Sequence, residues 1–216
     1  MQQLRFDAIK KVLCLGAHAD DIEIGAGGTV LTLLGARSDV EIHWVVFSAC
    51  GERRAEASES ANRFLDGCHK RRVDLLEFRD GFFPYEGGKI KEQFEELKRA
   101  GPPDLILTHQ RDDLHQDHRL VSELTWNTYR DHMILEYEIP KYDGGLGSPN
   151  VFVEMDDAVF GRKVQSLMEV FETQRSRRWF TPQTFEALAR LRGLECNARS
   201  GMAEAFYGRK IPLSWK

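Results

Sequence analysis

The chain has 216 residues, of which 42% are hydrophobic and 30% charged, an ordinary composition for one globular domain with a full core. Its formal net charge of −4 argues against a nucleic-acid-binding surface, which is usually basic. No run approaches the roughly 20 apolar residues of a membrane span, and the first residues lack the apolar stretch of a signal peptide. The four cysteines form no CxxC pair and are expected to be reduced, which predicts a cytoplasmic protein.

Strand-like and helix-like patterns alternate along the first 130 residues. Short apolar or β-branched runs predict strands over residues 11–15, 40–47, 73–78 and 104–108. Amphipathic patterns between them predict helices over residues 25–36, 53–65, 89–100 and 117–129. This alternation predicts a Rossmann-like α/β fold, in which a mostly parallel sheet carries helices on both faces. We interpret the basic residues Lys70, Arg71 and Arg72 as a solvated connection between a helix and a strand.

The pattern after residue 132 is less regular. We expect strands over residues 133–139 and 151–155, a Gly/Pro-rich loop over 142–150, and helices over 157–171 and 182–191. The sequence shows no internal repeat, low-complexity segment or linker. It therefore predicts a single domain over residues 1–216.

Two short segments place imidazoles and carboxylates directly after predicted strands. Residues 16–23 contain His18, Asp20 and Asp21, and residues 109–118 contain His115, Asp117 and His118. Because ligands bind at the carboxyl ends of parallel strands, both segments should meet at one edge of the sheet. Catalytic zinc takes three protein ligands and keeps one position for water. His18 and Asp21 can converge on one ion, and an imidazole of the second segment can complete the set. The sequence therefore predicts a metal-dependent hydrolase.

The same segments carry a resemblance to a known family. Residues 16–29 resemble the signature of the PIG-L/LmbE-like zinc N-deacetylases, and residues 115–118 match the family's His-x-Asp-His motif. The segment Ala203–Phe206 is similar to a recurrent family segment. Members remove the acetyl group from an N-acetylglucosamine-type sugar. The resemblance therefore implies a Zn2+-dependent deacetylase acting on a small-molecule sugar conjugate, and it leaves the attached group, the physiological metal and any homo-oligomer open.

The resemblance also implies a role for each matching residue. The expected zinc ligands are His18, Asp21 and His118. Asp20 is expected to act as the general base that takes a proton from the attacking water. His115 is expected to stabilise the oxyanion or to protonate the leaving amine, and which of Asp20 and His115 delivers the final proton stays open. Asp117 is expected to keep His115 charged, since a nearby carboxylate raises the pKa of an imidazole.

This sequence departs from the commonest family pattern at a few positions. Ala19 stands where most members have proline, and Ile22 stands where most have glutamate, but neither is a ligand position. Asp113 stands where some relatives place a tyrosine that helps to bind the oxyanion. That tyrosine's role is therefore vacant or filled from elsewhere.

Other residues near the motifs have two interpretations each. Arg53, at the end of the second strand, either binds an anionic group of the substrate or is an exposed helix-start residue. The glycines of 25–28 weakly suggest a dinucleotide loop, but the carboxylates before them would oppose a pyrophosphate, which favours close helix packing. His109 is a candidate partner of a ligand imidazole.

The loop regions and the function itself also keep alternatives. The aromatic residues of 137–150 form either a sugar-binding wall or part of the core, and the basic residues of 175–178 either bind an anionic substrate tail or complement a helix end. Two functions compete with sugar deacetylation. One is hydrolysis of another amide, such as a thiol–sugar conjugate, and the other is metal or sugar binding without catalysis.

Overall fold

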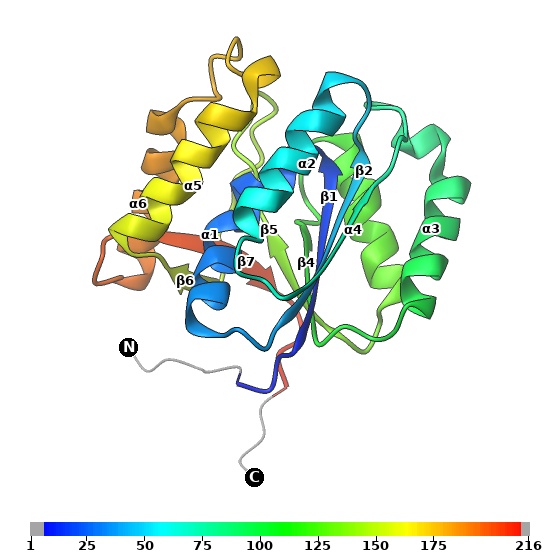
Figure 1. Ribbon diagram of the computed structural model, residues 1–216, viewed down its shortest axis with the longest axis horizontal. Helices are drawn as coiled ribbons and strands as arrows, with labels where there is room; N and C mark the ends of the chain where they lie inside the picture. Colours follow the sequence, from blue (N-terminus) through cyan, green and yellow to red (C-terminus); the bar gives the residue numbers. More distant parts are fainter. Residues whose placement is uncertain (1–6, 213–216) are drawn as a thin grey trace.

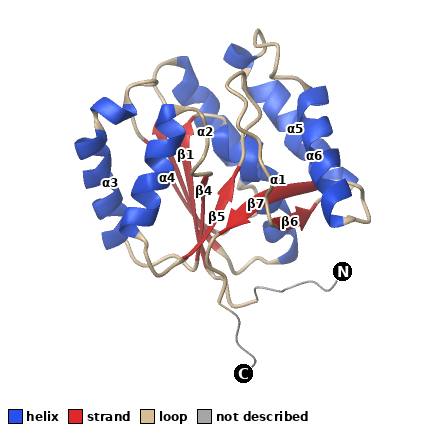
Figure 2. Cartoon of the chain, turned by 180° about the vertical axis from the view of Figure 1, so that it is seen from behind, coloured by secondary structure: helices blue, strands red, loops and turns tan. Residues whose placement is uncertain are grey.

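The chain folds into a twisted sheet that carries helices on both faces (Figures 1 and 2). The computed structural model describes residues 7–212, and within them the sheet has seven strands in the order β3-β2-β1-β4-β5-β7-β6. The strands from β3 to β5 pair in parallel, and β7 is antiparallel to both of its neighbours. The strands are β1 Lys11–His18, β2 Glu41–Ser48, β3 Lys70–Leu75, β4 Leu105–His109, β5 Met133–Tyr137, β6 Val151–Glu154 and β7 Ala203–Gly208.

The helices lie close to the predicted ranges, but the first begins at Asp21 rather than at residue 25 and the last ends at Cys196 rather than at residue 191. The α-helices are α1 Asp21–Ala36, α2 Glu52–Phe64, α3 Gly87–Arg99, α4 Gln116–Thr128, α5 Asp157–Val170 and α6 Pro182–Cys196, with 3-10 turns at Phe83–Tyr85 and Glu172–Gln174. Helices α1, α2 and α5 contact one another on one face of the sheet, and α3 and α4 pack together on the other. The predicted mostly parallel α/β fold is therefore confirmed. No described helix is both long and apolar enough to cross a membrane.

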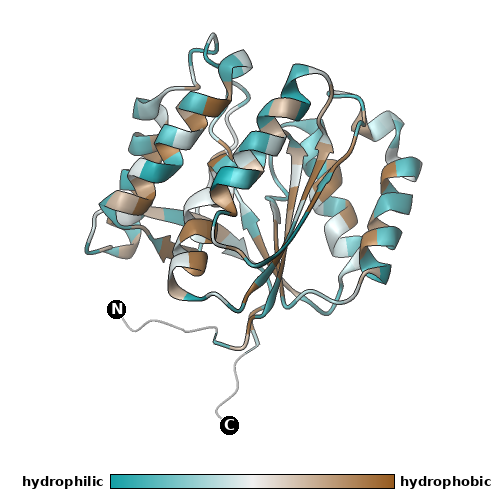
Figure 3. Cartoon of the chain, viewed as in Figure 1, coloured by the Kyte–Doolittle hydropathy of each residue, from teal (hydrophilic) through white to brown (hydrophobic). Residues whose placement is uncertain are grey.

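The central strand β1 is buried on both faces. Val12 and Cys14 pack into the layer of α1, α2 and α5, whereas Leu13 and Leu15 pack into the layer of α3 and α4. Figure 3 shows the resulting hydrophobic stretches along the central strands. Burial on both faces explains why this strand is a continuous apolar run in the sequence rather than an alternating one.

Helix α1 lies unusually close to its neighbours because of its glycines. A Cβ atom added at Gly25 would lie 2.1 Å from Cδ2 of Tyr137, and one added at Gly27 would lie 2.5 Å from Cε1 of Phe64. The segment is helical and forms no phosphate-binding loop, so the prediction of close helix packing is confirmed.

Strand β7 contains the recurrent segment Ala203–Phe206 and anchors α1. The carboxylate of Glu204 accepts hydrogen bonds from the backbone N–H groups of Gly28 and Thr29 at 2.7 and 2.6 Å. Lys163 of α5 donates to Glu204 at 2.6 Å and to the carbonyl oxygen of Ile24 at 2.7 Å. This buried network fixes the helix whose first turn carries the metal-site motif.

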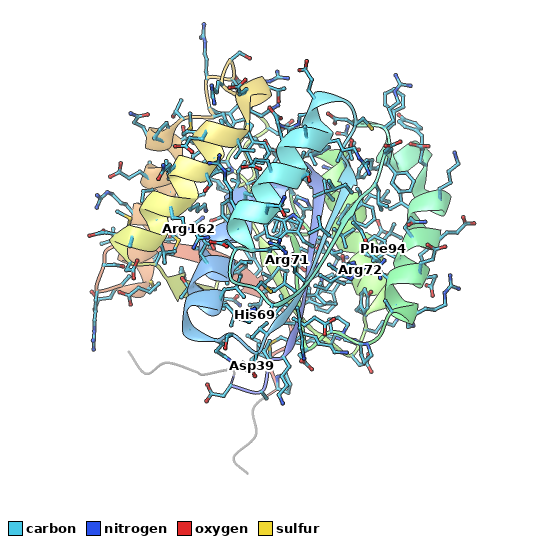
Figure 4. All side chains as sticks on the ribbon, in the orientation of Figure 1. Asp39, His69, Arg71, Arg72, Phe94 and Arg162 are labelled. Atoms are coloured by element: carbon cyan, nitrogen blue, oxygen red, sulfur yellow. The ribbon has the colours of Figure 1, made fainter. Side chains whose placement is uncertain are left out.

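The edge strand β3 differs from the sequence-based expectation. Lys70, Arg71 and Arg72 begin this strand, so their interpretation as a solvated connection is wrong (Figure 4 labels Arg71 and Arg72). An edge strand exposes side chains to water, and charged residues there also block pairing with other chains. Strand β7, the second difference, is a strand that the periodicity did not predict.

Candidate metal centre

The residues of the two motifs meet at the carboxyl edge of the sheet. His18 is the last residue of β1 and Asp21 the first of α1, while His118 lies in the first turn of α4. Because β1 and β4 are parallel neighbours, the segments that follow them leave the sheet at the same edge. The two motifs, about a hundred residues apart in the sequence, therefore lie next to each other in the structure.

The donor atoms of three side chains converge with the spacing of metal ligands. Nδ1 of His18 lies 3.1 Å from Nε2 of His118 and 3.3 Å from Oδ2 of Asp21. Oδ1 of Asp21 lies 3.5 Å from Nε2 of His118. Ligands at about 2.0–2.1 Å from a tetrahedral zinc ion lie about 3.3 Å from one another. The donor set of two imidazoles and one carboxylate therefore fits zinc, and it would also accept Fe(II) or Co(II).

The electrostatics of this group favour a cation. Burial opposes ionisation of Asp21, but the neighbouring His118 and His109 outweigh it and hold the pKa of this carboxyl well below its ordinary value. Burial lowers the pKa of His118 to about 3, so its imidazole is neutral and offers a lone pair. Burial also disfavours charge on His18, but Asp117, Asp21 and Asp80 raise its pKa well above the ordinary value. The carboxylates of Asp117, Asp21 and Asp80 therefore favour a positive charge at His18.

Each of these two imidazoles also has a carboxylate on its other nitrogen. Nε2 of His18 lies 3.2 Å from Oδ2 of Asp117, and Nδ1 of His118 lies 3.1 Å from Oδ2 of Asp113. Metal-binding histidines usually donate their second N–H to a carboxylate or carbonyl, which fixes the tautomer and the ring orientation. The arrangement of both rings is therefore that of metal-binding histidines.

Asp117 contacts more groups than the sequence predicts. Its carboxylate accepts hydrogen bonds from the backbone N–H groups of Gly81 at 2.6 Å and Phe83 at 3.1 Å, and it faces His18. Only its backbone N–H reaches Nδ1 of His115, at 3.3 Å. The carboxylate of Asp117 also lies near His115, and its charge raises the pKa of that imidazole. Burial and the charge of His18 lower the pKa of His115. The net shift is downward although Asp117 acts in the expected direction, and its role in keeping His115 charged stays a prediction.

The buried Asp20 pairs with the partly buried Arg53 beside the three converging side chains. Nη2 of Arg53 lies 2.8 Å from Oδ1 of Asp20, and Nη1 lies 3.1 Å from Oε2 of Glu56 and 3.2 Å from Oγ1 of Thr173. Burial raises the pKa of Asp20, and Arg53 opposes that rise. Arg53 is thus neither a free exposed residue nor wholly available to a substrate, because part of its guanidinium holds Asp20.

Other residues near the site were not predicted or were left with two interpretations. His109 is fully buried, with Nε2 3.2 Å from Oδ2 of Asp21, so it contacts a predicted ligand directly. Asp80, which no motif indicates, places Oδ1 3.1 Å from Nε2 of His18. Tyr137 is buried in the core, whereas Tyr142 is exposed. Three overlapping groups of side chains also have metal-ligand spacing: His18, His115 and His118; Asp21, His109 and His118; and His18, Asp80, His115 and Asp117.

Comparison with known proteins decides the family. A family model described as PIG-L, GlcNAc-PI de-N-acetylase, matches residues 13–129. The chain belongs to the PIG-L family. This PIG-L protein is 29% identical over 128 residues to a diacetylchitobiose deacetylase of Thermococcus kodakarensis, a match that covers 53% of this chain and about half, 47%, of the relative.

Solved structures share the fold of this PIG-L protein. The N,N'-diacetylchitobiose deacetylase from Pyrococcus horikoshii superposes with a TM-score of 0.73 at 22% identity, over 94% of this chain and 85% of that one. GalB, the 4-carboxy-2-hydroxymuconate hydratase from Pseudomonas putida, superposes with a TM-score of 0.74 at 16% identity, over 96% of this chain and 99% of that one. At these identities the likeness establishes the fold alone, and the chemistry has to be argued from the site.

Proposed function

We propose that this protein is a metal-dependent hydrolase that removes the N-acetyl group from an N-acetylglucosamine-type sugar conjugate. One observation carries the proposal: Nδ1 of His18, the carboxylate of Asp21 and Nε2 of His118 converge within 3.1–3.5 Å of one another. Membership of the PIG-L family supports the reaction class, and the relative named as a diacetylchitobiose deacetylase supports a sugar substrate.

His18, Asp21 and His118 are the proposed ligands, and zinc is the proposed ion. When bound, the ion would polarise the attacking water and lower the pKa of that water toward about 7. The side chain of His18 is 14% exposed while that of Asp21 is 4% exposed, so the set is open to substrate on the His18 side. Asp113 and Asp117 hold the outer nitrogens of the two imidazoles.

Asp20 follows β1 directly and is the proposed general base. Arg53 holds its Oδ1 at 2.8 Å, which fixes the carboxylate and leaves the other oxygen to accept a proton from water. The water oxygen then bonds to the acetyl carbon, the carbon–nitrogen bond breaks, and the nitrogen takes up a proton. The products are acetate and the free amino sugar. His115, at the start of α4, is the second group proposed to move that proton or to stabilise the oxyanion.

The partner in this proposal is a small molecule, and the group attached to the sugar is not specified by the site. All four cysteines lie within the described residues and are free, in keeping with the expectation of a cytoplasmic location. The proposal is tested against two alternative functions, hydrolysis of another amide and binding without catalysis.

The test is acetate release from N-acetylglucosamine and from its nucleotide-linked, lipid-linked and thiol- or aryl-linked conjugates. Zinc-loaded wild-type protein is compared with Asp20→Asn, with His115→Gln and with Asp112→Asn, a control at an exposed carboxylate of the same segment. We expect release by the wild type and the control, and a loss of at least about 100-fold in kcat for Asp20→Asn. Zinc binding without release from any conjugate would contradict the proposal.

A further inference from the structure

Asp113 lies between the end of β4 and the start of α4, and its side chain is fully buried. It occupies the position where some relatives have a tyrosine, yet its carboxylate does not face the open side of the site. Oδ2 lies 3.1 Å from Nδ1 of His118, and Oδ1 accepts a hydrogen bond from the backbone N–H of His115 at 2.8 Å. One carboxylate thus contacts a proposed metal ligand and the residue that caps α4.

Lys141 supplies the charge that this buried carboxylate requires. Its Nζ lies 2.7 Å from Oδ2 of Asp113 and donates to the carbonyl oxygen of Ile139 at 3.2 Å. The Lys141 side chain is 8% exposed, so the ammonium is withdrawn from water into the contact. A buried carboxylate without a partner is unfavourable, and the adjacent ammonium keeps Asp113 an anion that can only accept hydrogen bonds.

We propose that Asp113 and Lys141 are positioning residues for the metal ligand His118, a proposal that rests on the metal centre of the proposed function. Because Asp113 only accepts, Nδ1 of His118 must carry the hydrogen, and its Nε2 keeps the lone pair that faces His18 and Asp21. The ring of His109 stacks on His118 with centroids 3.9 Å apart, which fixes the ring plane. The hydrogen bond and the stacking together leave His118 one orientation.

The pair also ties the loop after β5 to the metal centre. Lys141 lies in this loop, and Gln110, which follows β4, donates from Nε2 to the carbonyl oxygen of Gly145 at 2.5 Å. A change at Lys141 therefore reaches His118 through Asp113, although Lys141 itself touches no proposed ligand.

An amide at position 113 cannot replace the carboxylate. Three donors converge on Asp113, from His118, Lys141 and the backbone of His115. The amide of Asn offers one acceptor oxygen, and its NH2 group would face a donor. Asp113→Asn therefore keeps the shape of the side chain while breaking the arrangement, and Asp112→Asn is the matched control at the neighbouring exposed carboxylate.

The experiment measures the affinity of the full-length protein for Zn2+ and Co2+ by competition with a chelator, together with the visible spectrum of the Co2+ form. We expect Asp113→Asn to bind both ions about 10- to 100-fold more weakly and to have an altered Co2+ spectrum. Losing the hydrogen-bond partner of a metal-binding histidine typically weakens metal affinity by this factor. Lys141→Met should lose less, roughly several-fold, Lys141→Arg should recover part of that loss, and Asp112→Asn should match the wild type.

Wild-type affinity and an unchanged Co2+ spectrum in folded Asp113→Asn would overturn the proposal. If that variant does not fold, Lys141→Met decides the question, and wild-type affinity in it would overturn the proposal equally. A wild-type protein that binds these ions but releases no acetate would contradict only the proposed function. A wild-type protein that binds neither ion would overturn both.

Discussion

Gly25 is the position on α1 where the helix lies directly against Tyr137, below the metal centre. Replacing it with alanine would place a Cβ atom 2.1 Å from Cδ2, 2.6 Å from Cγ and 2.9 Å from Cε2 of that ring. Tyr137 cannot move aside easily, because it is fully buried and its hydroxyl donates to the carbonyl oxygen of Leu15 at 2.6 Å. We therefore expect Gly25→Ala to destabilise the protein.

The size of the effect follows from three opposing contributions. Overpacking a core typically costs about 1–3 kcal/mol, and this contact lies at the severe end. Displacing the ring weakens a buried hydrogen bond, which costs about 1–3 kcal/mol more. Alanine is favoured over glycine in a helix by about 1 kcal/mol. The net expectation for Gly25→Ala is a loss of about 3–5 kcal/mol in the free energy of unfolding.

Denaturant unfolding monitored by circular dichroism measures this loss. Gly35→Ala is the matched control, because Gly35 lies on the same helix and a Cβ atom there meets nothing within 4 Å. The control should equal the wild type or exceed it by up to about 1 kcal/mol. The ring of Tyr137 also contacts His109, so Gly25→Ala should weaken metal binding as well. Equal stability of the two variants would refute the packing argument.

Three further predictions concern the site and its surroundings. Arg53→Ala should lower kcat on the order of 100-fold while metal affinity stays unchanged, since Arg53 holds Asp20 and touches no proposed ligand; a raised KM with unchanged kcat would instead identify a substrate contact. Burial raises the pKa of Glu23 to about 8, above its unfolded value, so wild-type stability should fall by up to about 1.4 kcal/mol per pH unit between about pH 4.5 and 8. Glu23→Gln should lack this slope. The same pH dependence of the free energy of unfolding in the wild type and in Glu23→Gln across pH 5–9 would contradict the assignment. Chelation of the bound metal should lower the melting temperature, and Zn2+ at 100 times its Kd should restore about 2.7 kcal/mol; a melting temperature independent of chelator and Zn2+ would argue against a metal centre.

The fold could be predicted because its signals are local. Central strands such as β1 are continuous apolar runs, and each is followed by a stretch with a helical sequence pattern. Strand β3 starts earlier than predicted because an edge strand tolerates the charges of Lys70, Arg71 and Arg72, which periodicity assigns to a connection. Strand β7 depends on pairing with β5 and β6, and pairing between distant segments leaves no local pattern.

The site could be predicted only as far as strand ends determine it. His18, Asp21 and His118 come together because β1 and β4 are parallel neighbours, a consequence of topology. The orientation of Asp117 depends on backbone N–H groups of Gly81 and Phe83, which belong to a loop distant in sequence. No spacing rule in a single sequence contains that information, and the same holds for the contact of Lys141 with Asp113.

Several neighbouring side chains could also bind a metal, so the central claim is which residues are its ligands. His109 shares a group of potential ligands with Asp21 and His118, and His115 shares another with His18. The proposed set of His18, Asp21 and His118 draws on both groups. Nδ1 of His18 and Nε2 of His118 face one another and the carboxylate of Asp21, while the other nitrogen of each ring contacts Asp117 or Asp113.

Anomalous diffraction at the zinc edge from crystals grown with Zn2+ tests this claim most directly. We predict one strong peak at about 2.0–2.2 Å from Nδ1 of His18, a carboxylate oxygen of Asp21 and Nε2 of His118. A peak bound instead by His115 and Asp80, or no peak in crystals of protein saturated with zinc, would contradict it.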